Sequence, residues 1–363
     1  MPATTPSTNR QSVEIGFTSN PAHWMRILDE IGAYDFYHLP AYQRLSERRL
    51  GGQAVLPVFR YGGYVMAFPL LVREIAIPGI KSDGYRDAAC VPGLTGPIAP
   101  HTDLPNHARD HLMAQFHEYL AENRVVSVYS RLHFLMGQEA FLAGYGERVE
   151  EGLEITVDLT LRPEEQFARY RLNHRRDVNK LRSKGFVCKE VGPEYLDEFL
   201  GIYYETMDYV QAKPLFYHER AYFEYLLNEM SDASRLFACM DGETLASIGV
   251  FTHCKGAVRY LYGGTAAEYR RLSPSKLVLD QVRIWGNSIG AHTFHLGGGN
   301  DSLCTFKMGF GGREHVYSTW RYVADQEAYH DLCARAFALA GRRPNDGYFP
   351  EYRSPSLNLG QEA

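Results

Sequence analysis

The chain has 363 residues, of which 45% are hydrophobic and 22% charged, and its formal net charge at pH 7 is -5. This length suggests about two domains of ordinary size, and the apolar fraction excludes a disordered or fibrous chain. Because the net charge is negative, the surface is not basic throughout, and a polyanion would have to bind at a local basic patch.

The sequence carries no sign of export, membrane insertion or metal binding. The first 20 residues are polar, without the basic and apolar regions of a signal peptide, and we expect them to be disordered. No apolar run approaches the roughly 18 residues of a spanning helix, so we expect no membrane span and a cytoplasmic location. The six cysteines include no C-x-x-C pair, which predicts neither a metal site nor a disulfide framework.

Helical and strand patterns alternate along the first part of the chain. A strand, a tight turn and a second strand are predicted around Gly62-Gly63, because alternating apolar residues flank these glycines. The segment 77–100 is rich in proline and glycine, which predicts a long, functional loop. The predicted regular elements are helices over 23–32 and 41–50, the hairpin over 55–73, a helix over 107–123 and a strand over 125–129.

The alternation continues in the second part, and together the two parts predict a mixed α/β fold. The predicted elements are a strand over 152–159, a helix over 163–184, helices over 194–210 and 219–230, three strands within 236–264, a helix over 277–288, strands over 293–296 and 316–323, and a last helix over 326–339. Gly63 and Ala67 in the first hairpin have the same spacing as Gly242 and Ala246 in the second. This match favours an internal duplication, with a boundary near 146–152.

The densest positive charge lies between Arg169 and Lys184. Seven arginines and lysines in this range face one acid, Asp177. A helix this basic could neutralise several phosphates of a nucleic acid, with an affinity that falls steeply with salt. A solvated helix face explains the composition equally well.

The most unusual segment is glycine-rich and runs from Phe294 to Gly312. Its three consecutive glycines would let backbone amides approach a ligand, and Asn300, Asp301 or Ser302 could cap the turn that follows. Lys307 stands among apolar residues, so we expect it to be partly desolvated. It could stabilise a developing oxyanion or anchor a phosphate, and the alternative is a glycine-rich bend with a snorkelling lysine.

The strands and helix from 236 to 296 look like the second half of a GNAT acyltransferase domain. In that superfamily, a [RQ]-x-x-G-x-[GA] loop before the helix binds the pyrophosphate of coenzyme A through its amides. Here the loop reads Arg270-Arg271-Leu272-Ser273-Pro274-Ser275, which has no glycine and contains a proline that removes one donor. Acetyl-CoA is therefore a poor cofactor candidate.

This GNAT-like half, the basic helix and the ending LGGG…FKMGFGG together resemble the FemABX family of aminoacyl-tRNA-dependent peptidyl transferases, in its broader FemAB-like branch. The resemblance covers about 37–322 and is strongest at 173–186, 204–227 and 296–312. It implies an α/β fold of two tandem GNAT-like domains with mixed central sheets and flanking helices. The implied division is a disordered stretch over 1–20, a first domain on the acceptor side over 21–150, completed by 325–363, and a second domain over 151–324 with the basic helix and the catalytic segment.

The implied activity is transfer of an amino acid from aminoacyl-tRNA to an amine, forming an amide. An aminoacyl ester is already activated, so this reaction needs no metal and no cofactor beyond the tRNA co-substrate. In similar enzymes a Phe-Lys pair stabilises the tetrahedral oxyanion, and it corresponds to Phe306 and Lys307. By the same analogy, the tRNA phosphates would meet Arg171, Arg175, Arg176, Lys180, Arg182 and Lys184.

The sequence indicates the amine acceptor less clearly than the aminoacyl-tRNA donor. Cell-wall members of the family carry an arginine three residues after a threonine, facing the acceptor's diphosphate, whereas here Thr206 is followed by Met207-Asp208-Tyr209. Tyrosine cannot replace a bidentate cation, which favours a small peptide or metabolite of natural-product (peptide antibiotic) biosynthesis over a peptidoglycan precursor. The tyrosines among the candidate substrate-binding residues could equally well be packed in the core. The candidates are Lys81, Asp83, Tyr85, Tyr209, Lys213, Tyr217, Tyr260, Tyr262, Gly297, Gly298 and Asn300.

Two further hypotheses stay open at this stage. A CoA-dependent N-acyltransferase on a diverged pair of GNAT domains would be stabilised by acyl-CoA and would not retain tRNA. If the chain is a non-catalytic nucleic-acid-binding protein, Lys307→Ala would have no effect in any transfer assay.

Overall fold

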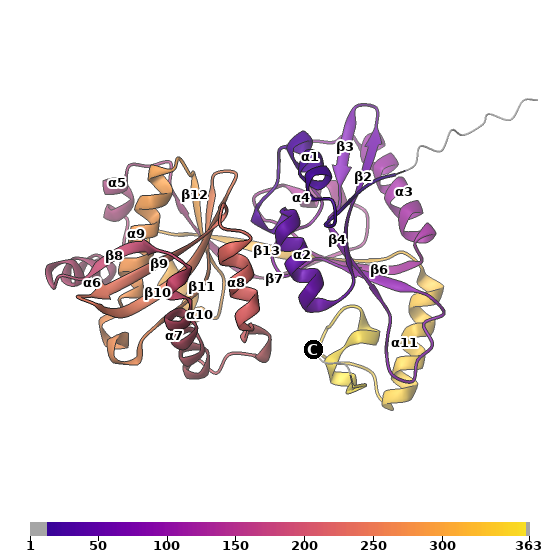
Figure 1. Ribbon diagram of the computed structural model, residues 1–363. Helices are drawn as coiled ribbons and strands as arrows, with labels where there is room; N and C mark the ends of the chain where they lie inside the picture. The colour runs from indigo at the N-terminus through magenta and orange to yellow at the C-terminus, as the bar shows by residue number, and fades with distance from the viewer. Residues whose placement is uncertain (1–12, 361–363) are drawn as a thin grey trace, which may run out of the picture.

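The computed structural model describes residues 13–360 and shows two α/β domains side by side (Figure 1). The first domain precedes the second in the chain, and the C-terminal helix returns to the first. The expected α/β architecture of two domains with mixed sheets and flanking helices is confirmed. Among residues 13–360, no helix is both long enough and apolar enough to cross a bilayer.

The first domain is built from a mixed sheet with helices on its faces. The hairpin predicted around Gly62-Gly63 is present, and both glycines have positive φ, which two-residue turns require. Its elements are β1 (Glu14–Phe17), α1 (Pro21–Ile31), α2 (Pro40–Leu50), β2 (Gln53–Tyr61), β3 (Tyr64–Ala67), β4 (Leu70–Glu74), β5 (Arg86–Ala89), α3 (Asn106–Glu122), β6 (Val125–Arg131) and α4 (Gln138–Leu142).

The second domain repeats this plan. Two short helices lead into an antiparallel three-stranded unit, a helix and a parallel strand, as the sequence predicts. Its elements are β7 (Glu147–Asp158), α5 (Pro163–Ala168), α6 (Leu172–Ser183), β8 (Val187–Val191), α7 (Leu196–Tyr209), α8 (Arg220–Asn228), β9 (Ser234–Asp241), β10 (Thr244–Cys254), β11 (Ala257–Thr265), α9 (Ser275–Ser288), β12 (Thr293–Gly297), α10 (Asp301–Met308) and β13 (Arg313–Val323).

Two long strands join the sheets of the domains. The strand order is β1-β2-β4-β5-β6-β13-β7-β12-β11-β10-β9-β8, with β3 on β2. β13 pairs with β6 of the first domain over Thr319–Val323 and with β7 over Arg313–Arg321, and the far end of β7 pairs with β12. The domain boundary predicted near 146–152 therefore falls at β7, a strand that links the sheets of both domains.

Three local predictions are wrong. Residues 14–17 form β1 on β2, so this part of the expected disordered start is ordered, whereas residues 1–12 lie outside the described residues. The expected loop 77–100 contains β5, whose fully buried Asp87 is paired with Arg73 and Arg353. The helix expected over 163–184 is interrupted at 169–171 and forms α5 and α6.

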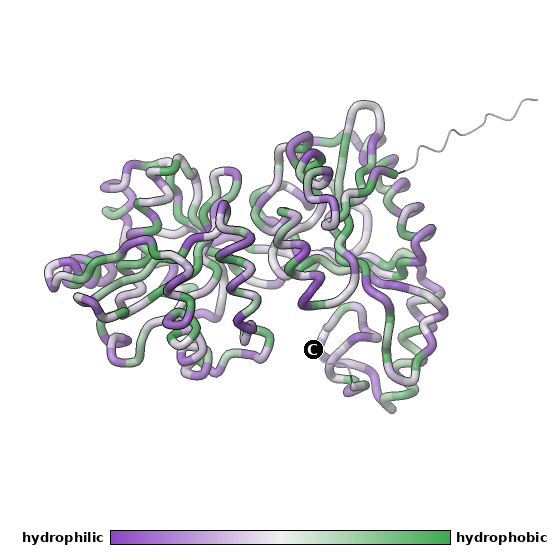
Figure 2. The backbone as a smooth tube through the Cα atoms, viewed as in Figure 1, coloured by the Kyte–Doolittle hydropathy of each residue, from purple (hydrophilic) through white to green (hydrophobic). Residues whose placement is uncertain are grey.

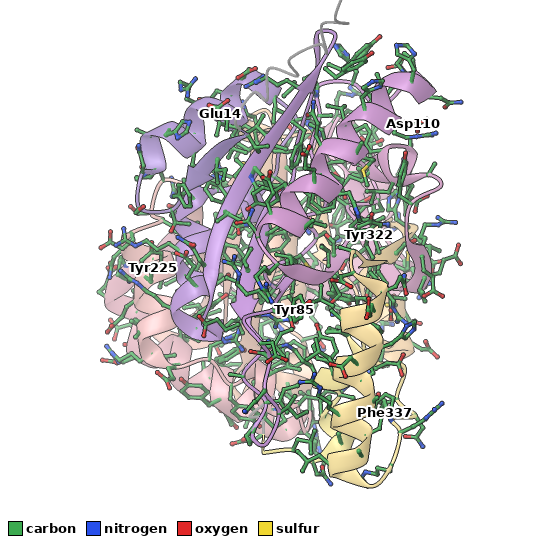
Figure 3. The ribbon with its side chains drawn as sticks, turned by 90° about the vertical axis from the view of Figure 1, so that its right-hand side faces the viewer. Glu14, Tyr85, Asp110, Tyr225, Tyr322 and Phe337 are labelled. Carbon is green, nitrogen blue, oxygen red and sulfur yellow. The ribbon has the colours of Figure 1, made fainter. Side chains whose placement is uncertain are left out.

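The C-terminal helix α11 (Gln326–Ala340) packs on the first domain. It shares a core cluster with Ile75 and Ile77 after β4 and with Val126 of β6. Figure 3 shows this helix, marked by Phe337, beside the segment that carries Tyr85. Residues of 326–360 therefore pack against the first domain, although most of its other elements lie before residue 143 in the chain.

Hydrophobic side chains from both domains form one core at the junction. α1 of the first domain and α7 and α8 of the second contribute to it, through Trp24, Phe199 and Phe223 among others, all fully buried. Figure 2 shows hydrophilic segments on the outer helix α6 and on exposed turns. A core shared in this way holds the two domains in a fixed relation.

Candidate active site

A glycine turn at the end of β12 forms the centre of the candidate site. β12 runs parallel to β11 only over residues 257–259, and β11 continues to Thr265 without pairing to β12. The chain turns through Gly297 and Gly299, both with positive φ, into α10, and the Asn300 side chain caps this helix by accepting from the Leu303 N–H at 3.0 Å. Asn300 is thus a helix cap, as the sequence suggested, and its side chain is engaged.

Lys307, on the last turn of α10, points back at this turn. Its Nζ donates to the Gly298 carbonyl at 2.5 Å, and the residue is 5% exposed. Burial lowers the pKa of Lys307 to about 8, and the charge of Glu154 partly opposes this effect. At neutral pH the lysine is therefore a mostly protonated, poorly solvated cation, which is suited to stabilise a developing negative charge.

Gly298 has no room for a side chain. A Cβ at this position would lie 2.1 Å from the Leu153 carbonyl oxygen of β7 and 3.7 Å from Oε1 of Glu154. The absence of a Cβ is what lets the turn approach β7 so closely. The sequence singled out the glycines and the lysine, but it gave no signal for Glu154.

Phe306, on α10, packs against His174 of α6. Its carbonyl accepts from Nε2 of His174 at 3.0 Å, and its ring lies 5.4 Å from the His174 ring. Burial lowers the pKa of His174 to about 4, so this histidine is neutral at pH 7. A Cβ at Gly309 would lie 2.3 Å from the His174 ring, so the glycine permits this packing. Phe306 and Lys307 are thereby held against the first turn of the basic helix.

The six basic residues predicted to meet tRNA fall into two groups. Arg171 donates to the Thr305 carbonyl at the end of α10, and Arg182 pairs with the buried Asp280 at 2.5 Å, so both support the fold. Arg175 is half-buried, and the other five residues are exposed, including the two with structural contacts, Arg171 and Arg182. α6 is therefore a partly anchored helix, and Arg176, Lys180 and Lys184 are the exposed cations outside its anchoring contacts.

The loop that would bind coenzyme A in a GNAT enzyme is occupied by internal contacts. Arg270 pairs with Glu205 at 3.0 Å and stacks over the Tyr209 ring at 4.2 Å. Lys276, in the first turn of α9, is buried and pairs with Asp177 of α6 at 2.6 Å. The start of α9 is thus covered by α6, in addition to lacking the glycines.

The tyrosines of β11 belong to two different cores. A bulge at Leu261 places Tyr260 opposite Phe251 and Tyr262 opposite Val250, so the two tyrosines face opposite sides of the sheet. Tyr260 stacks on Phe251 at 5.2 Å, in the core of the second domain. The Tyr262 hydroxyl pairs with that of Tyr222 at 2.9 Å, in the core at the domain junction. Both tyrosines therefore take part in core packing, and their role in substrate binding stays a prediction.

The other predicted tyrosine and lysine positions on the second domain are exposed. Tyr209 ends α7, Lys213 and Tyr217 lie in the segment that follows, and Tyr217 donates to Asp208 at 2.8 Å. No contact among the described residues joins them to Lys307.

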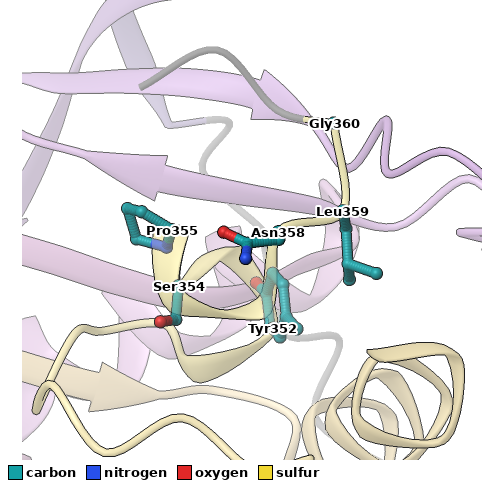
Figure 4. A pocket seen from close by; sticks show the side chains of 6 residues that line it. All are labelled: Tyr352, Ser354, Pro355, Asn358, Leu359 and Gly360. Carbon is teal, nitrogen blue, oxygen red and sulfur yellow. The ribbon is translucent and has the colours of Figure 1, made fainter. Parts of the chain in front are cut away.

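The three candidates of the first domain lie elsewhere. Asp83 pairs with Arg335 of α11 at 3.1 Å, the same arginine donates to the Lys81 carbonyl, and Arg124 stacks over Tyr85 at 4.5 Å. These contacts hold the segment against α11, so the structure does not bring it together with the glycine turn. A pocket of about 300 Å³ near the chain end, lined by Tyr352 and Asn358 among others, also lies on this domain (Figure 4).

A buried polar network at the domain junction was not predicted. Asp35, before α2, accepts from Arg259 of β11 and lies 3.3 Å from Nε2 of His133. All three side chains are at most 5% exposed. The His133 Nδ1 accepts from the Leu135 N–H, so its Nε2 carries the proton that faces Asp35. This network ties the first domain to the strand that borders the glycine turn.

Within residues 13–360, no group of three or more His, Cys, Asp or Glu side chains is placed to hold a metal ion. The six cysteines are all free thiols, three of them buried.

Known proteins resemble the chain mainly in fold. Residues 168–308 match the sequence family described as an acetyltransferase (GNAT) domain. The crystal structure of FemX is similar with a TM-score of 0.64 and 13% identity, covering 79% of this chain and 92% of FemX. L-PGS from Bacillus licheniformis is similar with a TM-score of 0.54 and 14% identity, covering 86% of this chain and 95% of L-PGS.

A third similar structure is the C-terminal domain of a putative lysylphosphatidylglycerol synthetase from Agrobacterium fabrum, with a TM-score of 0.51, 13% identity and coverage of 87% and 97%. No curated protein sequence matches the chain. At these identities the likeness establishes the fold: the chain has a FemX-like arrangement of GNAT domains, which confirms the structural part of the resemblance.

Proposed function

We propose that this FemX-like chain is an aminoacyltransferase, which moves an amino acid from aminoacyl-tRNA to the amine of a small peptide or metabolite. The observation that carries the proposal is the buried Lys307 ammonium on the glycine turn, next to Phe306. The fold likeness to FemX supports it, as does the sequence resemblance at the same segment.

The chemistry suits a lone buried cation. Attack of the amine nitrogen on the ester carbonyl forms the C–N bond and gives a tetrahedral oxyanion, and loss of the ribose oxygen breaks the C–O bond. Lys307 would donate to this oxyanion, and loss of one such donor typically slows a reaction by about a hundred- to a thousand-fold. No covalent intermediate, cofactor or metal is required, because the ester is already activated.

The tRNA would contact a small basic patch on the surface of the protein. Arg176, Lys180 and Lys184 are exposed on α6, whose first turn contacts the end of α10. A small patch of cations beside the catalytic turn fits the end of an RNA better than a long duplex, since the net charge of the chain is negative. Such a protein would act in the cytoplasm, where charged tRNA is found.

A CoA-dependent N-acyltransferase is the second candidate, because the family match is to an acetyltransferase domain. The contacts of Arg270 and Lys276 weigh against it, since they occupy the segment where the pyrophosphate would bind. A transferase that builds the interpeptide bridge of peptidoglycan is the third candidate, and the missing arginine after Thr206 weighs against it.

The test is transfer of radiolabel from a mixed pool of charged tRNAs into candidate amine acceptors. The proposal predicts a labelled amide whose formation is abolished by RNase and by omission of the aminoacyl-tRNA synthetases. Product formation that is insensitive to RNase would contradict it.

A further inference from the structure

We propose that Glu154 is a second catalytic residue, which accepts a proton from the attacking amine and returns it to the departing ribose oxygen. The inference rests on the proposed aminoacyl transfer and assigns the proton path that Lys307 alone leaves open.

Glu154 lies on β7 directly beside the glycine turn. It pairs in register with His315 of β13, and the neighbouring Leu153 carbonyl faces Gly298. A Cβ at Gly298 would stand 3.7 Å from Oε1 of Glu154, and one at Gly297 would stand 3.3 Å from Nζ of Lys307. The ammonium therefore lies near Gly297 and the carboxylate near Gly298, the next residue of the turn.

The carboxylate of Glu154 is incompletely satisfied. Its Oε2 is inaccessible to solvent and has no hydrogen-bond partner among the described residues. By contrast, the nearby Glu151 on the same strand accepts from the Thr319 hydroxyl at 3.0 Å and lies 3.4 Å from Arg321. A buried carboxylate oxygen without a donor is costly, and a catalytic role is one of the explanations for such a group.

The surroundings also favour a role at the reacting centre. Burial lowers the pKa of Lys307, and the negative charge of Glu154 partly opposes this; the same charge contributes to the raised pKa of Arg259, after Asp35, and to that of the Tyr37 hydroxyl, after burial. Tyr37 belongs to the first domain and is stacked under Arg259, with 4.7 Å between the guanidinium carbon and the ring centre. An amine that donates to Glu154 would lie beside the same glycine turn that Lys307 contacts.

The step balances without any further reactant. As the C–N bond forms, the nitrogen becomes positively charged and its proton moves to Glu154. As the C–O bond breaks, the protonated Glu154 gives that proton to the ribose oxygen, and the carboxylate is restored. Lys307 keeps its proton throughout and stabilises the negative charge of the oxyanion. Glu154 alone accepts and returns the transferred proton.

The test compares wild type with Glu154→Gln in single-turnover transfer from labelled aminoacyl-tRNA at slightly acidic pH. Two probe amines are used: alaninamide, which is mostly protonated there, and hydroxylamine, which is mostly not. We expect Glu154→Gln to lose about a hundred-fold in rate with alaninamide but less than about tenfold with hydroxylamine, because a weakly basic nitrogen needs less help in losing its proton. The dissociation constant for aminoacyl-tRNA should not change.

Two further variants control for structure. Glu150→Gln removes an exposed carboxylate four residues away on the same strand and should leave both rates unchanged. Glu154→Asp keeps a carboxylate on a shorter stem and should fall between wild type and Glu154→Gln with alaninamide, which keeps the test available if the glutamine variant does not fold.

The outcomes separate this inference from the proposed function. If wild type accelerates transfer to either amine, but Glu154→Gln loses the same factor with both or loses nothing, Glu154 is not the proton acceptor. If wild type accelerates neither amine above the uncatalysed rate, the proposed aminoacyl transfer itself fails.

Discussion

Replacing Lys307 with methionine should make the protein more stable while it removes activity. Burial lowers the pKa of Lys307 from 10.5 to about 8, and at ~1.36 kcal/mol per unit the buried ammonium costs about 3 kcal/mol of folding free energy at pH 7. Methionine is similar in length and carries no charge. It leaves the Gly298 carbonyl without its donor, which offsets about 1–2 kcal/mol.

The net expectation is a gain of about 1–2 kcal/mol at pH 7, or a rise in Tm of about 2–4 °C. The gain should depend on pH in a defined direction. Below pH 8 the lysine is protonated in both the folded and the unfolded chain, and the full cost is present. As pH rises from about 8 to 10.5, the folded chain has lost the proton that the unfolded chain still holds, so wild type becomes more stable relative to the variant.

The assay is thermal or urea unfolding of wild type, Lys307→Met and Lys189→Met at several pH values between 7 and 10. Lys189 is exposed on β8, so its substitution should change stability little at any pH. The reasoning is refuted if Lys307→Met unfolds at a lower temperature than wild type at pH 7, or if the difference between them grows as the pH rises.

Three other outcomes follow from the same contacts. Arg176→Glu removes an exposed cation, so it should weaken binding of aminoacyl-tRNA in a filter-binding assay. The slope of log K against log salt should fall in magnitude by about 1 or more, and an unchanged slope would exclude Arg176 from the interface. Gly298→Ala should unfold at lower urea because its Cβ would lie 2.1 Å from a carbonyl oxygen, whereas Gly201→Ala, with open space around it, should be as stable as wild type or more so. Arg259→Met should lower the free energy of unfolding by about 3–5 kcal/mol because it leaves Asp35 buried and short of its cation, and a smaller loss than about 1 kcal/mol would show that the pair is not integral to the junction.

The sequence predicts those parts of the fold that depend on local patterns. Alternating residues around Gly62-Gly63 predict the first hairpin, and the three strands before α9 follow from their turn glycines. The glycine-rich segment and Lys307 stand out for the same reason, because glycine in a turn and lysine among aromatic residues are visible without the fold. The site residues themselves stay predictions until activity is measured.

The missed features depend on partners that are remote in the chain. β5 carries the buried Asp87, which is tolerated because Arg73 and Arg353 both pair with it. No local sequence pattern indicates the pairing with Arg353. The break between α5 and α6 arises where the Arg171 N–H donates to the Gly309 carbonyl, a contact with a segment 138 residues further on. Glu154 looks like any exposed residue of an alternating strand until β12 brings the glycine turn beside it.

The most direct test of the account is a comparison of donors with one acceptor. Wild type and Lys307→Met are incubated with the same labelled amine, and with either aminoacyl-tRNA or acetyl-CoA as the donor. The account predicts amide from aminoacyl-tRNA alone, sensitive to RNase and slowed by about a hundred-fold or more in Lys307→Met. Amide formed from acetyl-CoA, with none from aminoacyl-tRNA, would contradict it.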